Sequence, residues 1–260
     1  MTAACLVGLV AIALAVGASP LFHVKTVEIT GTSELGRGDI LEAAGLRSDT
    51  NLITLSPRDV EDRIVADPWI RTAVVERHFP STLVITVTER VPAVAVRRDG
   101  TYWIVAADGV TLGESPREPG LPPVKGARPA PVGETTGPMA AAAAVAAAWP
   151  DVVLAEDPQI GIAPDGSVTV ELRRHITVDY GIPTDPAQKA QALAGVLVWA
   201  QRNKERLASI DLRVPGAPAA ELANGRTEND PNVSGDSGAV ANDGANERGR
   251  KNEESPTPTL

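Results

Sequence analysis

Apolar and polar residues follow clear periods along most of the chain, which begins with a run that is apolar throughout. Residues 3–18 carry no charge, and Leu21 and Phe22 extend their apolar character. A helix of about 20 residues rises about 30 Å, the hydrocarbon thickness of a bilayer. The pattern predicts a transmembrane helix over residues 1–21, while a cleaved signal peptide and a buried soluble helix are the alternatives with a similar composition.

The orientation of this helix in the membrane depends on the basic residues on either side of it. Lys25, on the carboxyl side, is the basic residue nearest to the apolar run. Basic residues collect on the cytoplasmic side of a span. For the body of the protein to lie outside the cytoplasm, we therefore expect a basic cytoplasmic leader upstream of residue 1.

Strand and helix periods then alternate over residues 22–90. Residues 24–30 alternate between apolar and polar side chains, which predicts a half-buried strand. Residues 39–45 have helical spacing and end on a glycine. Ser56-Pro57-Arg58-Asp59 offers a capping hydroxyl, a proline at the first helical position and a carboxylate in the first turn, so a second helix begins there.

Two further strands complete this first unit. Residues 70–77 and 83–90 are joined by the turn Phe79-Pro80-Ser81-Thr82, and Leu83, Ile85 and Val87 share one face of the second strand. The order strand, helix, helix, strand, strand predicts an α+β layer with two helices packed on one three-stranded sheet.

Residues 91–222 predict a second unit that is mostly antiparallel β with helices on one face. Residues 93–97, 102–106 and 110–112 form a meander, and the Pro- and Gly-rich residues 113–138 are a connection. The alanine-rich residues 138–149 suit a short packed helix, with a low-complexity spacer as the alternative. Strands follow at 160–163, 168–173 and 176–180, then a helix from Asp185-Pro186 and a last strand at 209–215.

The remaining residues, 223–260, are rich in Asn, Gly, Asp, Glu, Ser and Pro and hold hardly any aliphatic side chains. Such a segment cannot bury enough apolar surface to offset a backbone entropy of about 1–2 kcal/mol per residue. We therefore expect a disordered tail.

Composition excludes several classes of function. A formal net charge of −9 with scattered acidic residues leaves no basic face for nucleic acid. Cys5 is the single cysteine, and the three histidines are far apart in the sequence, so we expect no metal and no cofactor. No nucleophile or phosphate-loop motif occurs. We interpret Asp165, Asp179 and Asp211 as turn and strand-end residues, and keep a wall-glycan hydrolase that uses them as the enzymatic alternative.

Because we expect no enzymatic activity, the remaining function is the binding of another protein through an open strand. Because this strand is the last one in the sequence, we predict that its N–H and C=O groups over residues 210–214 are unpaired on one side. Another chain can add a strand there. Arg213 would face away from the apolar side chains and pair with an acidic partner. The alternative is that this strand only closes its sheet.

Several short motifs occur in order along the first unit: residues 24–31, Asn51-Leu52, Asp67-Pro68-Trp69-Ile70, Ala73-Val74, Arg77, Pro80-Ser81-Thr82-Leu83 and Glu89-Arg90-Val91-Pro92-Ala93. Together these motifs resemble the POTRA domain of the FtsQ/DivIB family of cell-division proteins. In the second unit, residues 178–181, Lys189 and residues 210–215 resemble the family's β domain. The resemblance covers roughly residues 20–220 and is thinner between 113 and 160.

This resemblance implies a single-pass protein of the cell membrane, with its body outside the cytoplasm, that is enriched at the division septum. It implies FtsB-like and FtsL-like partners and a non-enzymatic role in controlling septal peptidoglycan synthesis. The partner strand would lie beside Ile210, Asp211, Leu212, Arg213 and Val214 and continue to Ala217 and Leu222, although Pro215 and Pro218 lack N–H donors there. The alternative function is a POTRA-type chaperone of a protein translocation system.

Overall fold

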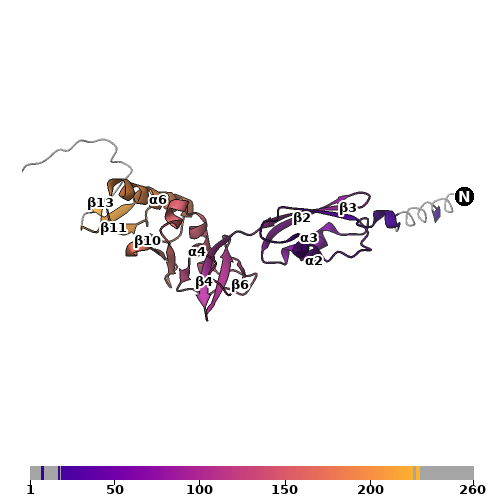
Figure 1. Cartoon of the computed structure of the whole chain (residues 1–260), viewed down its shortest axis with the longest axis horizontal. Helices are drawn as coiled ribbons and strands as arrows, with labels where there is room; N and C mark the ends of the chain where they lie inside the picture. Colours follow the sequence, from indigo (N-terminus) through magenta and orange to yellow (C-terminus); the bar gives the residue numbers. More distant parts are fainter. Residues whose placement is uncertain (1–6, 9–16, 18, 225–226, 229–260) are drawn as a thin grey trace, which may run out of the picture.

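The computed structural model describes residues 7–8, 17, 19–224 and 227–228. The predicted transmembrane helix over residues 1–21 and the predicted disordered tail over 223–260 therefore lie largely outside the described residues. Within the described ranges, no helix is long and apolar enough to cross a bilayer. The described chain is elongated, with two units placed end to end along its long axis (Figure 1).

The first unit is the predicted α+β layer. It contains η1 (Pro20–Phe22), β1 (Thr26–Thr30), α2 (Arg37–Ala44), α3 (Pro57–Val65), β2 (Ile70–His78) and β3 (Thr82–Glu89). The strand order is β1-β3-β2, with β1 parallel and β2 antiparallel to the central β3. The prediction of three strands and two helices in this unit is confirmed.

Local signals set the ends of these helices. The Ser56 hydroxyl accepts a hydrogen bond from the Asp59 N–H at 3.3 Å, and Pro57 occupies the first turn of α3. Gly45 ends α2 in the left-handed region with a φ of 61°, a conformation that favours glycine. Val60 and Ile64, one turn apart on α3, are fully buried against the sheet.

The core of the first unit forms on one face of β3. Leu83, Ile85 and Val87 alternate with polar residues and are buried, as their spacing predicts. They pack with buried side chains from both helices and from the loop before α3, among them Ile40 and Leu52. Each buried aliphatic side chain contributes about 1.5–3 kcal/mol, so this face is the main source of the unit's stability.

The second unit contains two sheets. Its elements are β4 (Pro92–Arg98), β5 (Thr101–Ala106), β6 (Thr111–Ser115), β7 (Val124–Lys125), α4 (Gly137–Ala147), α5 (Asp151–Leu154), β8 (Gln159–Ile162), β9 (Val168–Leu172), η2 (Arg173–His175), β10 (Ile176–Gly181), α6 (Pro186–Asn203), β11 (Leu207–Asp211), β12 (Ala219–Leu222) and β13 (Thr227–Glu228). The meander β4-β5-β6 forms one sheet, and a seven-stranded sheet has the order β13-β12-β11-β10-β9-β8-β7. Parallel pairing occurs at β7–β8 and β10–β11, and the other pairs of this sheet are antiparallel.

The alanine-rich segment is a packed helix. Thr136 caps α4 by accepting a hydrogen bond from the Met139 N–H, and Ala142, Ala143 and Ala146 are buried. The small side chains allow a close approach, since a Cβ atom at Gly109 would lie 2.5 Å from the Ala140 Cα. The helix prediction is confirmed here, whereas β7 within the expected connection and the short α5 were not predicted.

Arg90, directly after β3, joins the two units. Its guanidinium donates to the carbonyl oxygens of Pro68 and Ile70 in the first unit, at 2.8 and 2.7 Å. The same group pairs with Asp108 of the second unit at 3.0 Å, and both side chains are largely shielded from solvent. A partly buried ion pair of this kind orients the two units relative to each other.

Candidate protein-binding site

The strand predicted over residues 209–215 ends earlier than its apolar pattern indicates. β11 stops at Asp211, where a carboxylate oxygen accepts the backbone N–H of Arg213 at 2.9 Å. Aspartate side chains that bond the backbone two residues ahead form turns and compete with strands. The next turn brings the Ala217 N–H to the Val214 carbonyl oxygen, 3.1 Å away.

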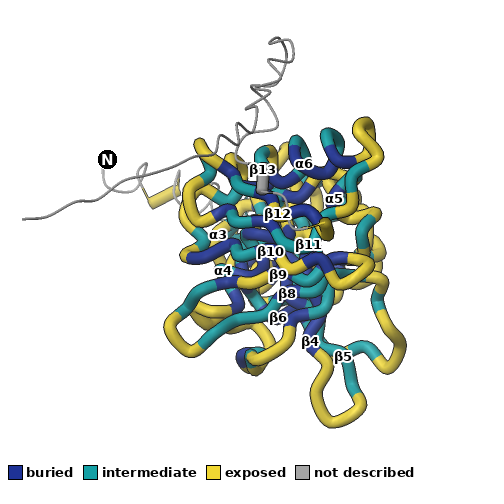
Figure 2. The backbone as a smooth tube through the Cα atoms, turned by 90° about the vertical axis from the view of Figure 1, so that its left-hand side faces the viewer, coloured by how far each residue is buried: buried dark blue, intermediate teal, exposed yellow. Residues whose placement is uncertain are grey.

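The expectation that residues 210–214 form an open edge is wrong. Ile210 pairs with Val178 of β10 on one flank and with Ala220 of β12 on the other. Figure 2 shows β12, β11, β10, β9 and β8 lying side by side in this order. The reason is that the chain reverses after Pro218 and adds another strand over residues 219–222, so β11 is an inner strand.

The predicted contact residues divide into two groups. Ile210, Leu212 and Leu222 are buried in the core of the second unit. Arg213, Val214 and Ala217 are exposed in the turn between β11 and β12, and Asp211 is half-buried at the base of that turn. The structure therefore leaves only the turn residues with side chains available to a partner.

Two carboxylates and Arg213 form a cluster beside this turn. Asp179 and Asp211 lie opposite each other at the carboxyl ends of the parallel strands β10 and β11. The Arg213 Nε lies 3.0 Å from Asp211 and 3.5 Å from Asp179. Hydrogen bonding by Arg213 lowers the pKa of the Asp211 carboxyl. The charge of Arg213 is thus compensated within its own chain, contrary to the expected pairing with a partner.

Lys189 binds the backbone that follows Asp179. It is almost fully buried, and its Nζ donates to the carbonyl oxygens of Tyr180 at 2.5 Å and Ile182 at 2.8 Å. Burial lowers its pKa, although Asp179, Asp185 and Asp211 oppose that shift. One feature of the sequence indicates that Lys189 is buried: it lies one turn before Leu193, on the apolar stripe of α6.

On the flank that faces away from β11, β12 pairs with the short strand β13, which lies at this edge of the sheet. We call this outer flank of β12 the margin. The Ala223 N–H donates to the Arg206 carbonyl oxygen at 2.7 Å. Successive N–H groups of a strand point to opposite sides, so the N–H of Glu221 faces β11 and those of Ala220 and Leu222 face outward. Over the described residues, β13 pairs with Ala220 and Glu221 only. A strand of two residues therefore occupies this margin.

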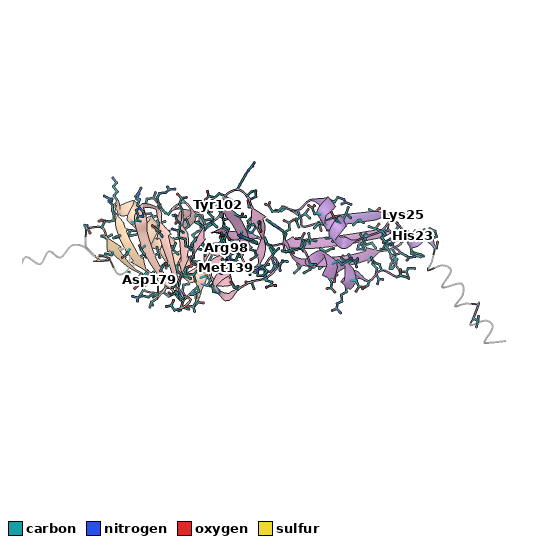
Figure 3. All side chains as sticks on the ribbon, turned by 90° about the horizontal axis from the view of Figure 1, so that it is seen from below. His23, Lys25, Arg98, Tyr102, Met139 and Asp179 are labelled. Carbon is teal, nitrogen blue, oxygen red and sulfur yellow. The ribbon has the colours of Figure 1, made fainter. Side chains whose placement is uncertain are left out.

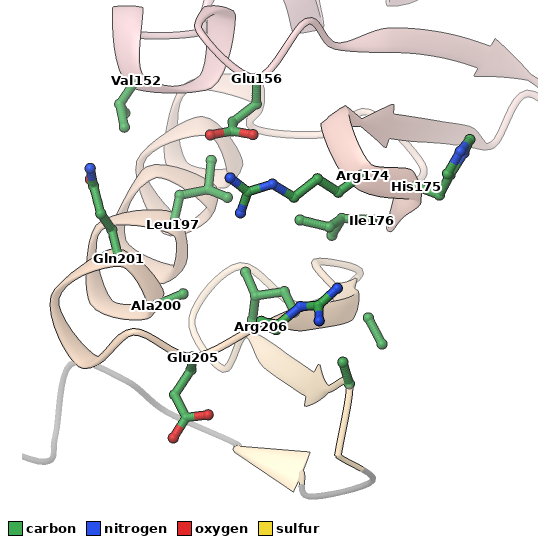
Figure 4. A pocket seen from close by; sticks show the side chains of 13 residues that line it. Val152, Glu156, Arg174, His175, Ile176, Leu197, Ala200, Gln201, Glu205 and Arg206 are labelled. Atoms are coloured by element: carbon green, nitrogen blue, oxygen red, sulfur yellow. The ribbon is translucent and has the colours of Figure 1, made fainter.

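A pocket opens at the other end of β11 and β12 (Figure 4). Its volume is about 400 Å³, and it is lined by residues from α5, the β9–β10 hairpin, the end of α6 and the start of β11, including Glu156, Arg174, Leu197, Arg206 and Ala223. Arg174 and His175 have φ values of 65° and 61°. Left-handed backbone at two successive residues that are not glycine is strained and makes a tight, well-defined rim.

Each of the three aspartates of the enzymatic alternative has a partner within the chain. Within the described ranges, no three potential metal ligands come together. The Asp165 carboxylate accepts hydrogen bonds from the N–H and hydroxyl of Ser167, which lowers its pKa, and it serves a turn. Asp179 and Asp211 both contact the Arg213 guanidinium.

Comparison with known proteins gives matches over most of the chain. The family model described as "POTRA domain, FtsQ-type" matches residues 22–90. The chain is 30% identical to the cell division protein FtsQ of Mycobacterium leprae over 184 residues, which are 71% of this chain and 53% of that protein. It is 31% identical to FtsQ of Mycobacteroides abscessus over 180 residues, which are 69% and 57% of the two chains.

A more distant bacterium gives a similar result, since FtsQ of Caulobacter vibrioides is 38% identical over 112 residues, 42% of this chain and 37% of that protein. The chain spans little more than half the length of the mycobacterial relatives it matches. These matches confirm the resemblance seen in the sequence: the chain is similar to FtsQ cell-division proteins over about 70% of its length, and residues 22–90 match an FtsQ-type POTRA domain.

Proposed function

We propose that this chain is a non-enzymatic, single-pass membrane scaffold of the bacterial division complex. It binds FtsB-like and FtsL-like proteins and thereby controls septal peptidoglycan synthesis. Similarity to proteins named cell division protein FtsQ supports the division role. The apolar residues 3–18 support the membrane anchor. The observation that carries the binding mode is the outer flank of β12, where a strand of only two residues is paired.

In the proposed complex, a partner strand takes the place of β13. It bonds to the outward N–H groups of Ala220 and Leu222 and to the carbonyl groups beside them. Because both of these side chains are buried, the main chain supplies most of the recognition along β12. The affinity then depends on how many main-chain bonds the partner adds beyond the pairing that β13 already makes.

Two surfaces at the ends of β12 contribute selectivity in this proposal. Val214, 62% exposed, and Ala217 precede the strand in the turn that carries the Asp211 and Arg213 pair. Ala223 follows it at the rim of the pocket shown in Figure 4. A partner segment that continues past either end of β12 meets an apolar and charged turn on one side and a pocket on the other.

Co-purification of the full chain with FtsB-like and FtsL-like proteins tests this proposal. Ala220→Pro removes an outward N–H and leaves the bonds toward β11 in place, so we expect the partner to be lost. The control is Glu221→Gln, which changes an exposed side chain and no main-chain donor. Thermal unfolding of both variants verifies that the second unit is folded.

A second measurement does not depend on the proline variant. Cysteines placed in the partner strand, one position at a time, are tested for disulfide formation with Glu221→Cys in a Cys5→Ser background. Strand addition predicts cross-links at alternate partner positions, because side chains alternate between the faces of a sheet. Equal cross-linking at all positions, or none, contradicts the proposed binding mode.

A further inference from the structure

Both phenylalanines of the chain belong to the first unit. Phe22 belongs to η1 and Phe79 to the turn between β2 and β3, and their rings pack edge to face with centroids 6.2 Å apart. Phe79 is 56% exposed, and Leu21 and Ile53, which adjoin Phe22 and Leu52 in the sequence, are 53% and 42% exposed. We call Leu21, Phe22, Ile53 and Phe79 the apolar tip.

Single exposed apolar residues are common on protein surfaces and need no explanation. The tip differs because four large apolar side chains gather from three segments that are distant in sequence. These segments are η1, the loop before α3 and the β2–β3 turn. A gathered apolar patch is typical of a surface that is covered in the cell.

Main-chain hydrogen bonds hold the three segments together. The Leu52 N–H donates to the Phe22 carbonyl oxygen at 2.8 Å, and the Lys25 N–H donates to the Ser81 carbonyl oxygen at 2.9 Å. The Arg77 guanidinium donates to the carbonyl oxygens of Leu52, Ile53 and Leu55 and lies 5.9 Å from the centre of the Phe79 ring. The tip is therefore a built surface and not a set of loose loops.

Gly17, which belongs to the apolar N-terminal run, contacts this surface. The Asn51 side-chain amide donates to the Gly17 carbonyl oxygen at 2.8 Å. A Cβ atom on Gly17 would lie 3.9 Å from the Ile53 Cδ1, which is ordinary van der Waals contact. Gly17 is nearly the last residue of the uncharged stretch 3–18. Where that stretch leaves a bilayer, the tip lies at the bilayer surface.

Basic side chains flank the tip. Lys25 and Arg77 belong to the segments that build it, and Figure 3 shows His23 and Lys25 at the end of the first unit that lies away from the second unit. The nearby carboxylates have partners, since Asp49 lies 3.4 Å from Arg47 and Glu76 lies 3.8 Å from His78. Basic groups next to apolar side chains match a membrane surface, where phosphate head groups lie above acyl chains.

We propose that the apolar tip inserts into the head-group region of an anionic lipid bilayer, so that the first unit stands on the membrane. The partner is lipid, and the binding residues are Leu21, Phe22, Ile53 and Phe79, with Lys25 and Arg77 toward the phosphates. This inference rests on the membrane anchor of the proposed function. It is independent of the binding of protein partners at β12.

The test uses the full chain with Cys5→Ser and one new cysteine, labelled with bimane and reconstituted into vesicles of phosphatidylglycerol and phosphatidylethanolamine. Labels at Ile53→Cys and Ser81→Cys report on the tip, and a label at Val214→Cys reports on the far unit. We expect brominated lipids to quench the two tip labels and to leave the label at residue 214 unquenched. Quenching that is equal at all three positions overturns the proposal.

A second set of variants separates lipid insertion from mere proximity. With the label at residue 81, Phe79→Ser and Leu21→Ser together remove the inserting side chains, and we expect the loss of quenching. Val91→Ser, an exposed valine outside the tip, is the control and should retain it. Chains that float with vesicles but show no tip quenching overturn the tip alone, whereas chains that do not float overturn the anchor as well.

Discussion

At the end of β3, two adjacent charged residues hold segments that are distant in the sequence. The Glu89 carboxylate accepts the backbone N–H groups of Ser33, Glu34 and Leu35 at 2.8–3.0 Å, and so fixes the loop before α2. Arg90 holds the start of β2 and the second unit. The Glu-Arg pair that marks the family resemblance is therefore a pair of structural clamps.

Glu89 makes the stability of the first unit depend on pH. Burial raises the pKa of Glu89, but the three N–H donors outweigh it and hold the pKa below its ordinary value of 4.5. The stabilisation is present above that value and is lost as the pH falls through the lowered pKa. We expect Glu89→Gln to lose about 1 kcal/mol of unfolding free energy at pH 7, a modest figure because the site is solvated.

Urea unfolding of the full chain at pH 7 and at successively lower pH measures this effect. The difference between the wild-type chain and Glu89→Gln should shrink as the solution becomes acidic. Glu28→Gln, which removes an exposed carboxylate from β1, is the matched control for charge. A pH-independent difference would show that the carboxylate charge is not what holds the loop.

Replacing Lys189 should also lower the stability of the protein. Lys189→Met keeps the apolar stem but leaves the carbonyl oxygens of Tyr180 and Ile182 without their donor. We expect a destabilisation of about 1–3 kcal/mol and faster hydrogen exchange in residues 181–185. Arg202→Met, an exposed position on the same helix, is the control, and equal effects of the two variants would contradict this role.

The sequence predicts those helices and strands whose formation depends on residues close together in the chain. The alternation of Leu83, Ile85 and Val87, the cap at Ser56 and the stripe on α6 each need only neighbouring residues. β7 is different, because its two residues become a strand only by pairing with Ile160 and Gly161 of β8. No periodicity can arise in so short a segment.

The candidate site was predicted less well, for the same reason. The apolar pattern correctly indicates a strand that buries Ile210, but β11 ends at Asp211 and Val214 is exposed. The pattern contains no information on which strands lie on the two flanks, and β12 was not expected because its four residues follow two prolines. Arg213 likewise reads as an unpaired charge until the parallel register brings Asp179 to Asp211.

β13 gives a prediction at the scale of one strand. If it occupies the margin to which a partner adds, a chain that ends after Asn224 exposes the outward groups of Ala220 and Leu222. We expect this truncated chain to bind the FtsB-like partner more tightly than the full chain. A chain that ends after Asp230 retains β13 and serves as the control.

Fluorescence anisotropy of a labelled partner peptide, titrated with each of the three chains, supplies the comparison. The affinity gained on truncation measures how strongly β13 competes for the margin. Indistinguishable affinities for the two truncated chains would mean that β13 does not compete, and that partner binding must use another surface.

For the whole molecule, the junction at Arg90 determines how the two units are oriented. Asp108→Asn removes the ion pair with Arg90 and retains the oxygen that accepts the Val110 N–H. We expect a broader distribution of distances between spin labels at positions 28 and 202, with unchanged unfolding of each unit. Asp99→Asn breaks the exposed pair with Arg98 and should leave the distribution narrow.

The long axis of the chain has a consequence for the geometry of assembly. The first unit lies at one end of this axis, and β11 and β13 lie toward the other (Figure 1). If the apolar tip rests on lipid as proposed, β12 is held at a fixed distance from the membrane. A partner anchored in the same bilayer would then need a stiff segment of matching length to reach β12, so the first unit would select partners by their length.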